Sequence, residues 1–88
     1  MNFKIEFSNK AYKYYKKVDG ITRKRINNHL SILSENPMFS ELDIKKLKGH
    51  KDTYRLRIGD LRLLYTIEDN VLVITVLKIG PRGDIYNV

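Results

Sequence analysis

Apolar positions in the first half of the chain change from the alternation of a strand to the spacing of helices. The stretch FKIEF, residues 3–7, alternates apolar and polar side chains and predicts a short strand. Ser8 can cap a following helix, and apolar residues recur from there at helical spacing until Asp19 and Gly20 interrupt them. A second helical pattern then runs to about Asn36, where the next residue, a proline, ends it. So short a break between two helices predicts an antiparallel helical hairpin.

Strand patterns dominate the second half of the chain. We expect strands at about residues 53–58, 61–68 and 71–78, whereas residues 38–52 predict irregular or briefly helical structure. The last strand, VLVITVLK, is almost continuously apolar and β-branched and predicts a central strand. The order β-α-α-β-β-β predicts one α+β domain over residues 1–88, with two N-terminal helices packed on one face of a small, mainly antiparallel four-stranded sheet.

The turn between the first two of these strands determines where their arginines point. Gly59 and Asp60 have the glycine-first composition of a type II′ turn, which sets the register of the hairpin. In that register Arg57 lies directly opposite Arg62, and Arg55 shares their face. The other face, which lies under the helices, carries Tyr54, Leu56, Ile58, Leu61, Leu63 and Tyr65. Directly opposed like charges destabilise a sheet by about 0.2–1 kcal/mol. Because a planar guanidinium donates two parallel hydrogen bonds to phosphate, the three arginines predict an anion-binding surface.

The net charge of the chain favours a polyanionic partner. Its 88 residues include 17 Lys+Arg and 10 Asp+Glu, a formal charge of +7, which attracts nucleic acid, an anionic membrane surface or an acidic protein. Further cations precede the first arginine-bearing strand and occupy a Gly-Pro-Arg-Gly loop near the end, namely Lys46, Lys48, Lys51 and Arg82. The alternative is a solvated basic face, whose arginines lie over apolar neighbours or reach a nearby acid such as Glu68.

Cofactor chemistry has no signature in this sequence. Cysteine is absent, His29 and His50 have no carboxylate cluster at ligand spacing, and no glycine-rich loop precedes a helix. We therefore expect no metal and no cofactor. The absence of cysteine, of an apolar signal region and of a run long enough to span a bilayer predicts a cytoplasmic protein without a membrane segment.

One reaction of RNA needs neither a metal nor a protein nucleophile, namely attack by a 2′-hydroxyl on the adjacent phosphate. The protein must align the attacking oxygen, neutralise charge on the phosphoryl oxygens and protonate the departing 5′-oxygen. Arginine neutralises charge well but is a poor proton donor, because its pKa lies above ~12. Proton transfer would therefore fall to Lys48, His50, Lys51 or Tyr86.

Three motifs together resemble the RelE branch of the RelE/ParE toxin superfamily: KLKG, YRLRIGDLRLLY and GPRGDIY. The early stretch FKIEFSNKAYKYYKKV is similar to that family's first strand and helix, so the resemblance covers almost the whole chain. It implies the toxin of a type II toxin–antitoxin pair, an enzyme that cuts mRNA in the ribosomal A site without a metal ion. It also implies a cognate antitoxin that neutralises the toxin, with operator DNA contacted only through the complex of the two.

The resemblance also implies roles for individual residues. Arg57, Arg62, Arg82 and Tyr86 take catalytic positions, with Tyr86 at the position of the catalytic tyrosine. The residues that we expect to bind RNA are Lys46, Lys48, Lys51 and Arg55. Well-known bacterial members carry lysines at the positions of Arg55 and Arg57.

Two other interpretations fit the same sequence. The ParE branch, whose members poison gyrase, shares the scaffold and similar strand motifs. A non-catalytic module of the same fold would use its basic surface to bind an acidic protein or RNA without cutting it.

Overall fold

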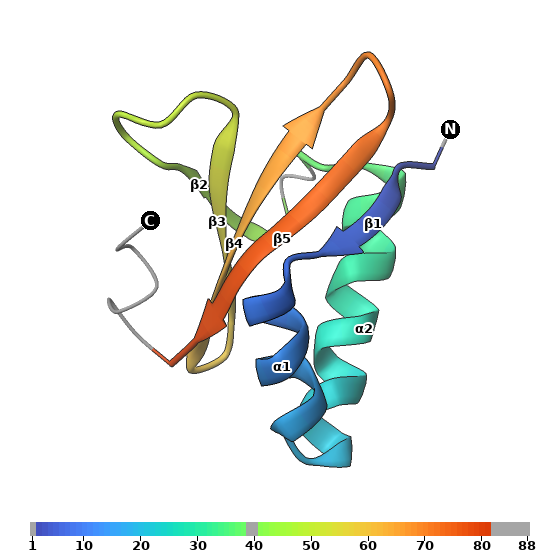
Figure 1. The fold of residues 1–88 in the computed structure, drawn as a ribbon, viewed down its shortest axis with the longest axis vertical. Coiled ribbons are helices and arrows are strands. Elements are labelled where there is room, and N and C mark those ends of the chain that lie inside the picture. The colour runs from blue at the N-terminus through green and yellow to red at the C-terminus, as the bar shows by residue number, and fades with distance from the viewer. Residues whose placement is uncertain (1, 39–40, 82–88) are drawn as a thin grey trace.

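The chain folds into two helices and a five-stranded sheet (Figure 1). The computed structural model describes residues 2–38 and 41–81. The elements in chain order are β1 (Lys4–Phe7), α1 (Asn9–Lys17), α2 (Gly20–Glu35), β2 (Asp43–Lys46), β3 (Thr53–Ile58), β4 (Leu61–Glu68) and β5 (Val73–Gly80). In the part of the chain that is described, no helix combines the length and the apolar character needed to cross a membrane.

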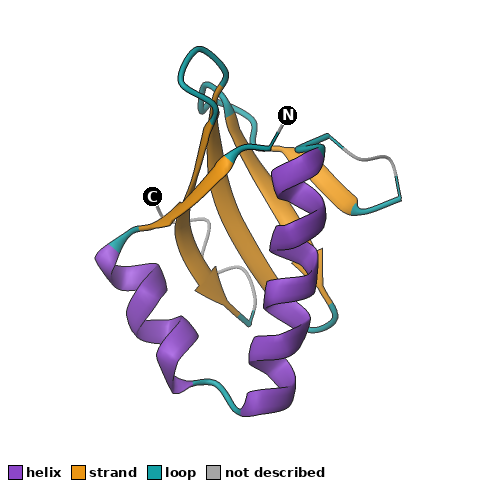
Figure 2. Ribbon diagram, turned by 90° about the vertical axis from the view of Figure 1, so that its right-hand side faces the viewer, coloured by secondary structure: helices purple, strands orange, loops and turns teal. Residues whose placement is uncertain are grey.

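The strands are arranged in the order β1-β5-β4-β3-β2. β1 pairs with β5 in parallel, and every other neighbouring pair is antiparallel. Figure 2 shows both helices on one face of this sheet. The α+β class, the mainly antiparallel sheet and the interior position of the VLVITVLK strand are therefore confirmed.

The prediction of four strands was wrong, because β2 lies within residues 38–52, for which irregular or briefly helical structure was expected. β2 is a four-residue edge strand, DIKK, in which Ile44 alone is half-buried. So short a segment carries no readable alternation of its own. Its pairing with β3, in which Asp43 lies opposite Arg57, makes it a strand.

The strand expected at residues 71–78 begins later, at Val73. Leu72 has a positive φ of 54° and donates its backbone N–H to the carbonyl of Asp69 at 3.3 Å. The turn after β4 therefore extends through Leu72, although this residue belongs to the apolar run that predicted the strand.

The hydrophobic core lies between the helices and the sheet. Its buried members are Ala11, Ile26, Leu30, Leu33, Leu56, Ile58, Leu63, Tyr65, Ile67, Ile74, Val76 and Ile79. Tyr65 is the largest fully buried side chain, and its hydroxyl donates to the carbonyl of Pro37 at 3.0 Å. Burial, with a smaller effect of nearby Tyr54, raises the pKa of Tyr65 far above its ordinary value. This hydroxyl therefore stays protonated and serves the fold.

A β-bulge interrupts the pairing of β4 with β5. Lys78 lies opposite Leu64, whereas the next pair joins Val76 to Tyr65. Leu77 is left between them as an extra residue without a partner in β4. The alternation of faces along β5 therefore changes at Leu77.

Ser8 connects the start of α1 to this bulge. Its hydroxyl accepts a hydrogen bond from the Ala11 N–H at 3.1 Å, which caps the helix, and donates to the carbonyl of Leu77 at 2.7 Å. One short side chain thus satisfies a free donor at the helix end and the carbonyl of the bulged residue.

We expect Ser8→Ala to lower the free energy of unfolding by about 1–2 kcal/mol, because it removes a helix cap and a half-buried hydrogen bond together. Urea denaturation measures this loss. Ser31→Ala, at an exposed position inside α2, is the matched control and should change stability by less than about 0.5 kcal/mol. Equal effects of the two substitutions would contradict the linking role of Ser8.

Candidate functional site

The hairpin of β3 and β4 has the expected register. Arg57 lies opposite Arg62, and Tyr54 lies opposite Tyr65. Of the two turn residues only Gly59 has a positive φ, of 58°, which fits a type II′ turn. Because Leu56, Ile58, Leu63 and Tyr65 belong to the helix-side core, the arginines, which alternate with them along the strands, occupy the opposite face of the sheet, as predicted.

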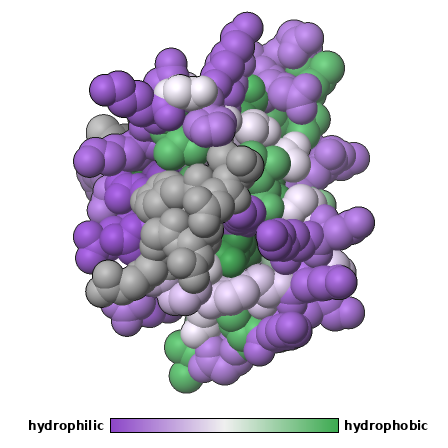
Figure 3. Space-filling view, turned by 60° about the vertical axis from the view of Figure 1, so that its left-hand side comes forward, coloured by the Kyte–Doolittle hydropathy of each residue, from purple (hydrophilic) through white to green (hydrophobic). Residues whose placement is uncertain are grey.

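Two rows of directly paired residues cross this opposite face, which we call the arginine face. Residues opposite one another on neighbouring strands share a face, so the register defines both rows. The row nearer the turn contains Asp43, Arg57, Arg62 and Gly80, and the next row contains Lys45, Arg55, Leu64 and Lys78. In the space-filling view of Figure 3, hydrophilic side chains make up most of the rim of the visible side, and several smaller apolar patches lie among them.

Lys78 was not among the expected site residues, and the bulge explains why. Val76 is buried in the core, so plain alternation would direct Lys78 toward the core as well. The extra residue Leu77 reverses this and puts Lys78 on the arginine face, opposite Leu64. No glycine or other turn residue in VLVITVLK marks the bulge, so the sequence carries no signal for this placement.

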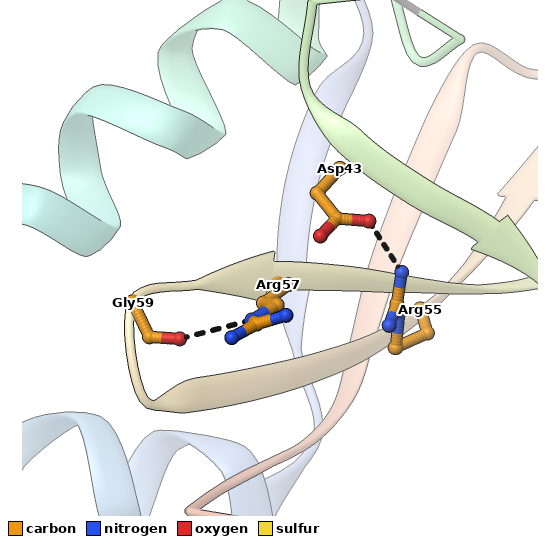
Figure 4. A network of polar contacts seen from close by, with 4 residues as sticks. All are labelled: Asp43, Arg55, Arg57 and Gly59. Atoms are coloured by element: carbon orange, nitrogen blue, oxygen red, sulfur yellow. Dashed lines mark hydrogen bonds and ion pairs between the residues drawn. The ribbon is translucent and has the colours of Figure 1, made fainter.

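Arg55 is engaged by an acid of the same chain. Its Nη2 donates to Oδ1 of Asp43 at 2.6 Å, an ion pair between β3 and the edge strand β2 (Figure 4). The Arg55 side chain is 12% exposed, and the Asp43 side chain is 54% exposed. Arg55 Nε is buried and has no hydrogen-bond partner among the residues described. The acid that reaches an arginine is thus Asp43, and among the ion pairs of the described residues none involves Glu68.

Arg57 and Arg62 differ from Arg55, because neither forms an ion pair within the described part of the chain. Arg57 is exposed, and its Nε donates to the carbonyl of Gly59 at 3.3 Å (Figure 4). Arg62 is half-buried between Arg57 and Gly80. Two guanidinium-bearing residues therefore lie opposite each other without an ion-paired acid among residues 2–38 and 41–81, an arrangement that suits binding of an anion.

The predicted lysines lie elsewhere. Lys46 is opposite Tyr54, so it belongs to the helix-side face of the sheet and not to the arginine face. Lys48 and Lys51 lie in the loop between β2 and β3, where they line an open concavity with Lys46 and His50. The loop lysines thus form a separate basic area beyond the ends of the strands.

Two of the expected catalytic residues, Arg82 and Tyr86, lie outside the described residues. The described chain ends at Pro81, directly after Gly80, and Gly80 is the partner of Arg62. Within residues 2–38 and 41–81, no three His, Cys, Asp or Glu side chains come together in a way that could hold a metal ion.

Comparison with known proteins decides the family. Residues 5–86 match the family model described as the ParE toxin of the type II toxin–antitoxin system parDE. This chain belongs to the RelE/ParE superfamily of type II toxins.

Several relatives and solved structures that are similar to this chain carry RelE names. The chain is 34% identical over 86 residues to Toxin RelE3 of Methanocaldococcus jannaschii, covering 96% of each protein. It is 29% identical over 91 residues to the mRNA interferase toxin RelE of Escherichia coli K12, covering 99% of this chain and 93% of the relative. Its fold is similar, with a TM-score of 0.82 and 30% identity, to a chain of the archaeal RelE–RelB complex from Pyrococcus horikoshii, covering 94% of this chain and 98% of the other. The resemblance seen in the motifs is therefore confirmed.

The opposed arginines of this RelE/ParE chain offer a test of the site geometry. We expect Arg62→Glu to raise the free energy of unfolding by about 0.5 kcal/mol, because it replaces a like-charge cross-strand pair with an opposite-charge pair. Arg62→Gln removes the repulsion without adding attraction and should give a smaller gain. Urea denaturation of both variants measures the effect, and a loss of stability in both would show that the guanidinium groups do not oppose one another.

Proposed function

We propose that this toxin is a metal-independent endoribonuclease that cuts mRNA on the translating ribosome. The observation that carries the proposal is the adjacent pair Arg57 and Arg62, which lie directly opposite each other with no acid of the described chain paired to either. The repulsion between two like charges lowers the stability of the fold, so a function in binding an anion best explains the pair. The similarity to proteins named mRNA interferase supports RNA as that anion.

In this proposal the two arginines neutralise the scissile phosphate. The 2′-oxygen loses its proton and forms a bond to phosphorus, the bond from phosphorus to the 5′-oxygen breaks, and that oxygen takes up a proton. The products are a 2′,3′-cyclic phosphate and a 5′-hydroxyl. Guanidinium groups stabilise the charge that grows on the phosphoryl oxygens, whereas their high pKa makes them poor proton carriers.

The remaining roles follow from the family resemblance. Arg82 would add a third cation, and Tyr86 would transfer a proton as general acid or base. In the sequence Arg82 directly follows Pro81, the last described residue, and Pro81 follows Gly80, the partner of Arg62. The basic area of Lys46, Lys48 and Lys51 would bind RNA away from the cleaved bond, where positive charge contributes affinity without chemistry.

A cognate antitoxin completes the proposal. Solved structures similar to this chain include RelE–RelB complexes from Pyrococcus horikoshii and Escherichia coli. By that likeness we propose that an antitoxin protein covers this toxin and that the complex, not the toxin alone, contacts operator DNA. Action on ribosomes would place the active toxin in the cytoplasm.

A gyrase-directed toxin is the second candidate, because the matching family model is that of ParE. It would induce a DNA-damage response in expressing cells and leave mRNA intact. Primer extension on cellular mRNA after induction separates the two candidates, since only an endoribonuclease produces new 5′ ends within messages.

We expect Arg62→Ala and Arg82→Ala each to slow cleavage by about 100-fold, the cost typical of losing one preorganised group that stabilises transition-state charge. The measurement adds purified protein to programmed ribosomes and maps the cut sites on the message. Both variants should also abolish growth arrest in expressing cells, and the upstream product should end in a 2′,3′-cyclic phosphate.

The matched control is Lys24→Ala, which removes one positive charge from an exposed position on α2. It should cleave at the rate of the unaltered protein. Circular dichroism and thermal melting check that every variant is folded. Full activity of both arginine variants would remove the proposed site, and a 3′-hydroxyl on the upstream product would rule out the 2′-oxygen mechanism.

A further inference from the structure

Asp43 is the sole acid in the two rows that cross the arginine face. The other charged members of these rows are Lys45, Arg55, Arg57, Arg62 and Lys78. Asp43 occupies the position of β2 that pairs with Arg57. Its carboxylate reaches diagonally to Nη2 of Arg55. A surface adapted only to attract anions would not carry a negative charge at this place.

The burial of the two partners is unequal, which indicates what the pair does in the free protein. Arg55 is 12% exposed, so without a partner its guanidinium would be a largely buried, uncompensated charge. Asp43 is 54% exposed and lies on the edge strand β2, so water can solvate its carboxylate if the pair opens. The arginine therefore needs an anion beside it, and another anion that reaches Nη2 could serve in place of the exposed Asp43 carboxylate.

We propose that Asp43 is a built-in competitor that occupies, in the free toxin, the position that an RNA phosphate takes at Arg55. This inference rests on the proposed function, because it concerns the same surface and the same ligand. When RNA binds, a phosphate oxygen replaces the Asp43 carboxylate at Nη2 and the freed carboxylate turns to solvent. Arg55 is then the RNA-binding residue that the sequence predicts, but only after this exchange.

The exchange costs free energy and therefore lowers the affinity of the toxin for RNA. The carboxylate weakens the positive potential at Arg55 and at the opposite residue Arg57, and it repels a phosphate that approaches either of them. RNA must therefore break one charge-assisted hydrogen bond to form another. Asp43 holds Arg55 ordered without RNA and lowers the affinity for RNA at the same time.

The test measures binding of a short, fully 2′-O-methylated oligoribonucleotide, which lacks the attacking hydroxyl and is not cut. We expect Asp43→Asn to bind this RNA about three- to fivefold more tightly than the unaltered protein, the upper part of the range for a charge pair with a solvent-exposed member. In an Arg55→Gln background the same substitution should raise the affinity for RNA by less than about twofold, because the guanidinium for which the carboxylate and the phosphate compete is then absent. Asp43→Glu keeps the carboxylate and should bind like the unaltered protein.

Stability gives an independent readout of the exchange. Without RNA, Asp43→Asn should lower the Tm by about 2–6 °C, since Arg55 loses its partner. With saturating RNA this difference should disappear, because a phosphate then serves Arg55 in both proteins. A merely structural ion pair would keep the same difference in Tm with and without RNA.

Glu6→Gln is the matched control for the change of charge. Glu6 lies on the same face of the sheet but on the opposite edge strand β1, and it pairs with Lys4 at 3.6 Å. Its substitution should change the affinity by less than about twofold. An Asp43→Asn protein that binds RNA no more tightly, while the unaltered protein binds and cuts, overturns the competition and leaves the proposed function intact. Failure of the unaltered protein both to bind RNA and to cut on ribosomes overturns the two together.

Discussion

The register of β3 against β4 is the constraint on which the rest of this structure depends. A two-residue turn with Gly59 at φ 58° allows one alignment of the two strands, in which Leu56 faces Leu63 and Arg57 faces Arg62. A slip of one residue would exchange the faces, exposing the core leucines and burying guanidinium groups. The hydrophobic effect therefore enforces the alignment. The same alignment places Arg57 opposite Arg62, although the two like charges repel each other.

A second constraint, the bulge in β5, determines which residues of β5 lie on the arginine face. The bulge at Leu77 turns Lys78 out of the core. Ser8 stabilises the bulge, because its hydroxyl accepts a hydrogen bond from the Ala11 N–H at the helix end and donates one to the carbonyl of Leu77. This places Lys78 in the same row as Arg55 and leaves Gly80 beside Arg62, one residue before the described chain ends at Pro81. The N-terminal strand and helix thus affect the position of cations that lie far away in the sequence.

The electrostatics of the arginine face divide its arginines into two kinds. Arg57 and Arg62 have no acid of the described chain paired to them, whereas Arg55 is largely buried and held by Asp43. A fold selected for stability alone would pair all three. The proposed cleavage of RNA would give this departure a use, because guanidinium groups without an acid partner can bind phosphate.

Much of the fold follows from local pattern. The capping serine, the Asp19-Gly20 break, the proline after α2 and the glycine-first turn act through neighbours in sequence, so the helices and the hairpin were predicted with its register and its two faces. The separation of Arg57 and Arg62 from the core was predictable for the same reason.

What the tertiary structure decided involves partners distant in the chain. β2 has no pattern of its own and becomes a strand only because β3 offers it hydrogen bonds. The bulge that moves Lys78 to the arginine face, the location of Lys46 on the helix side and the pairing of Arg55 with Asp43 all depend on how separate strands align. A sequence states which charges a chain carries, but the distances between them, and therefore which are neutralised, arise only when the sheet closes.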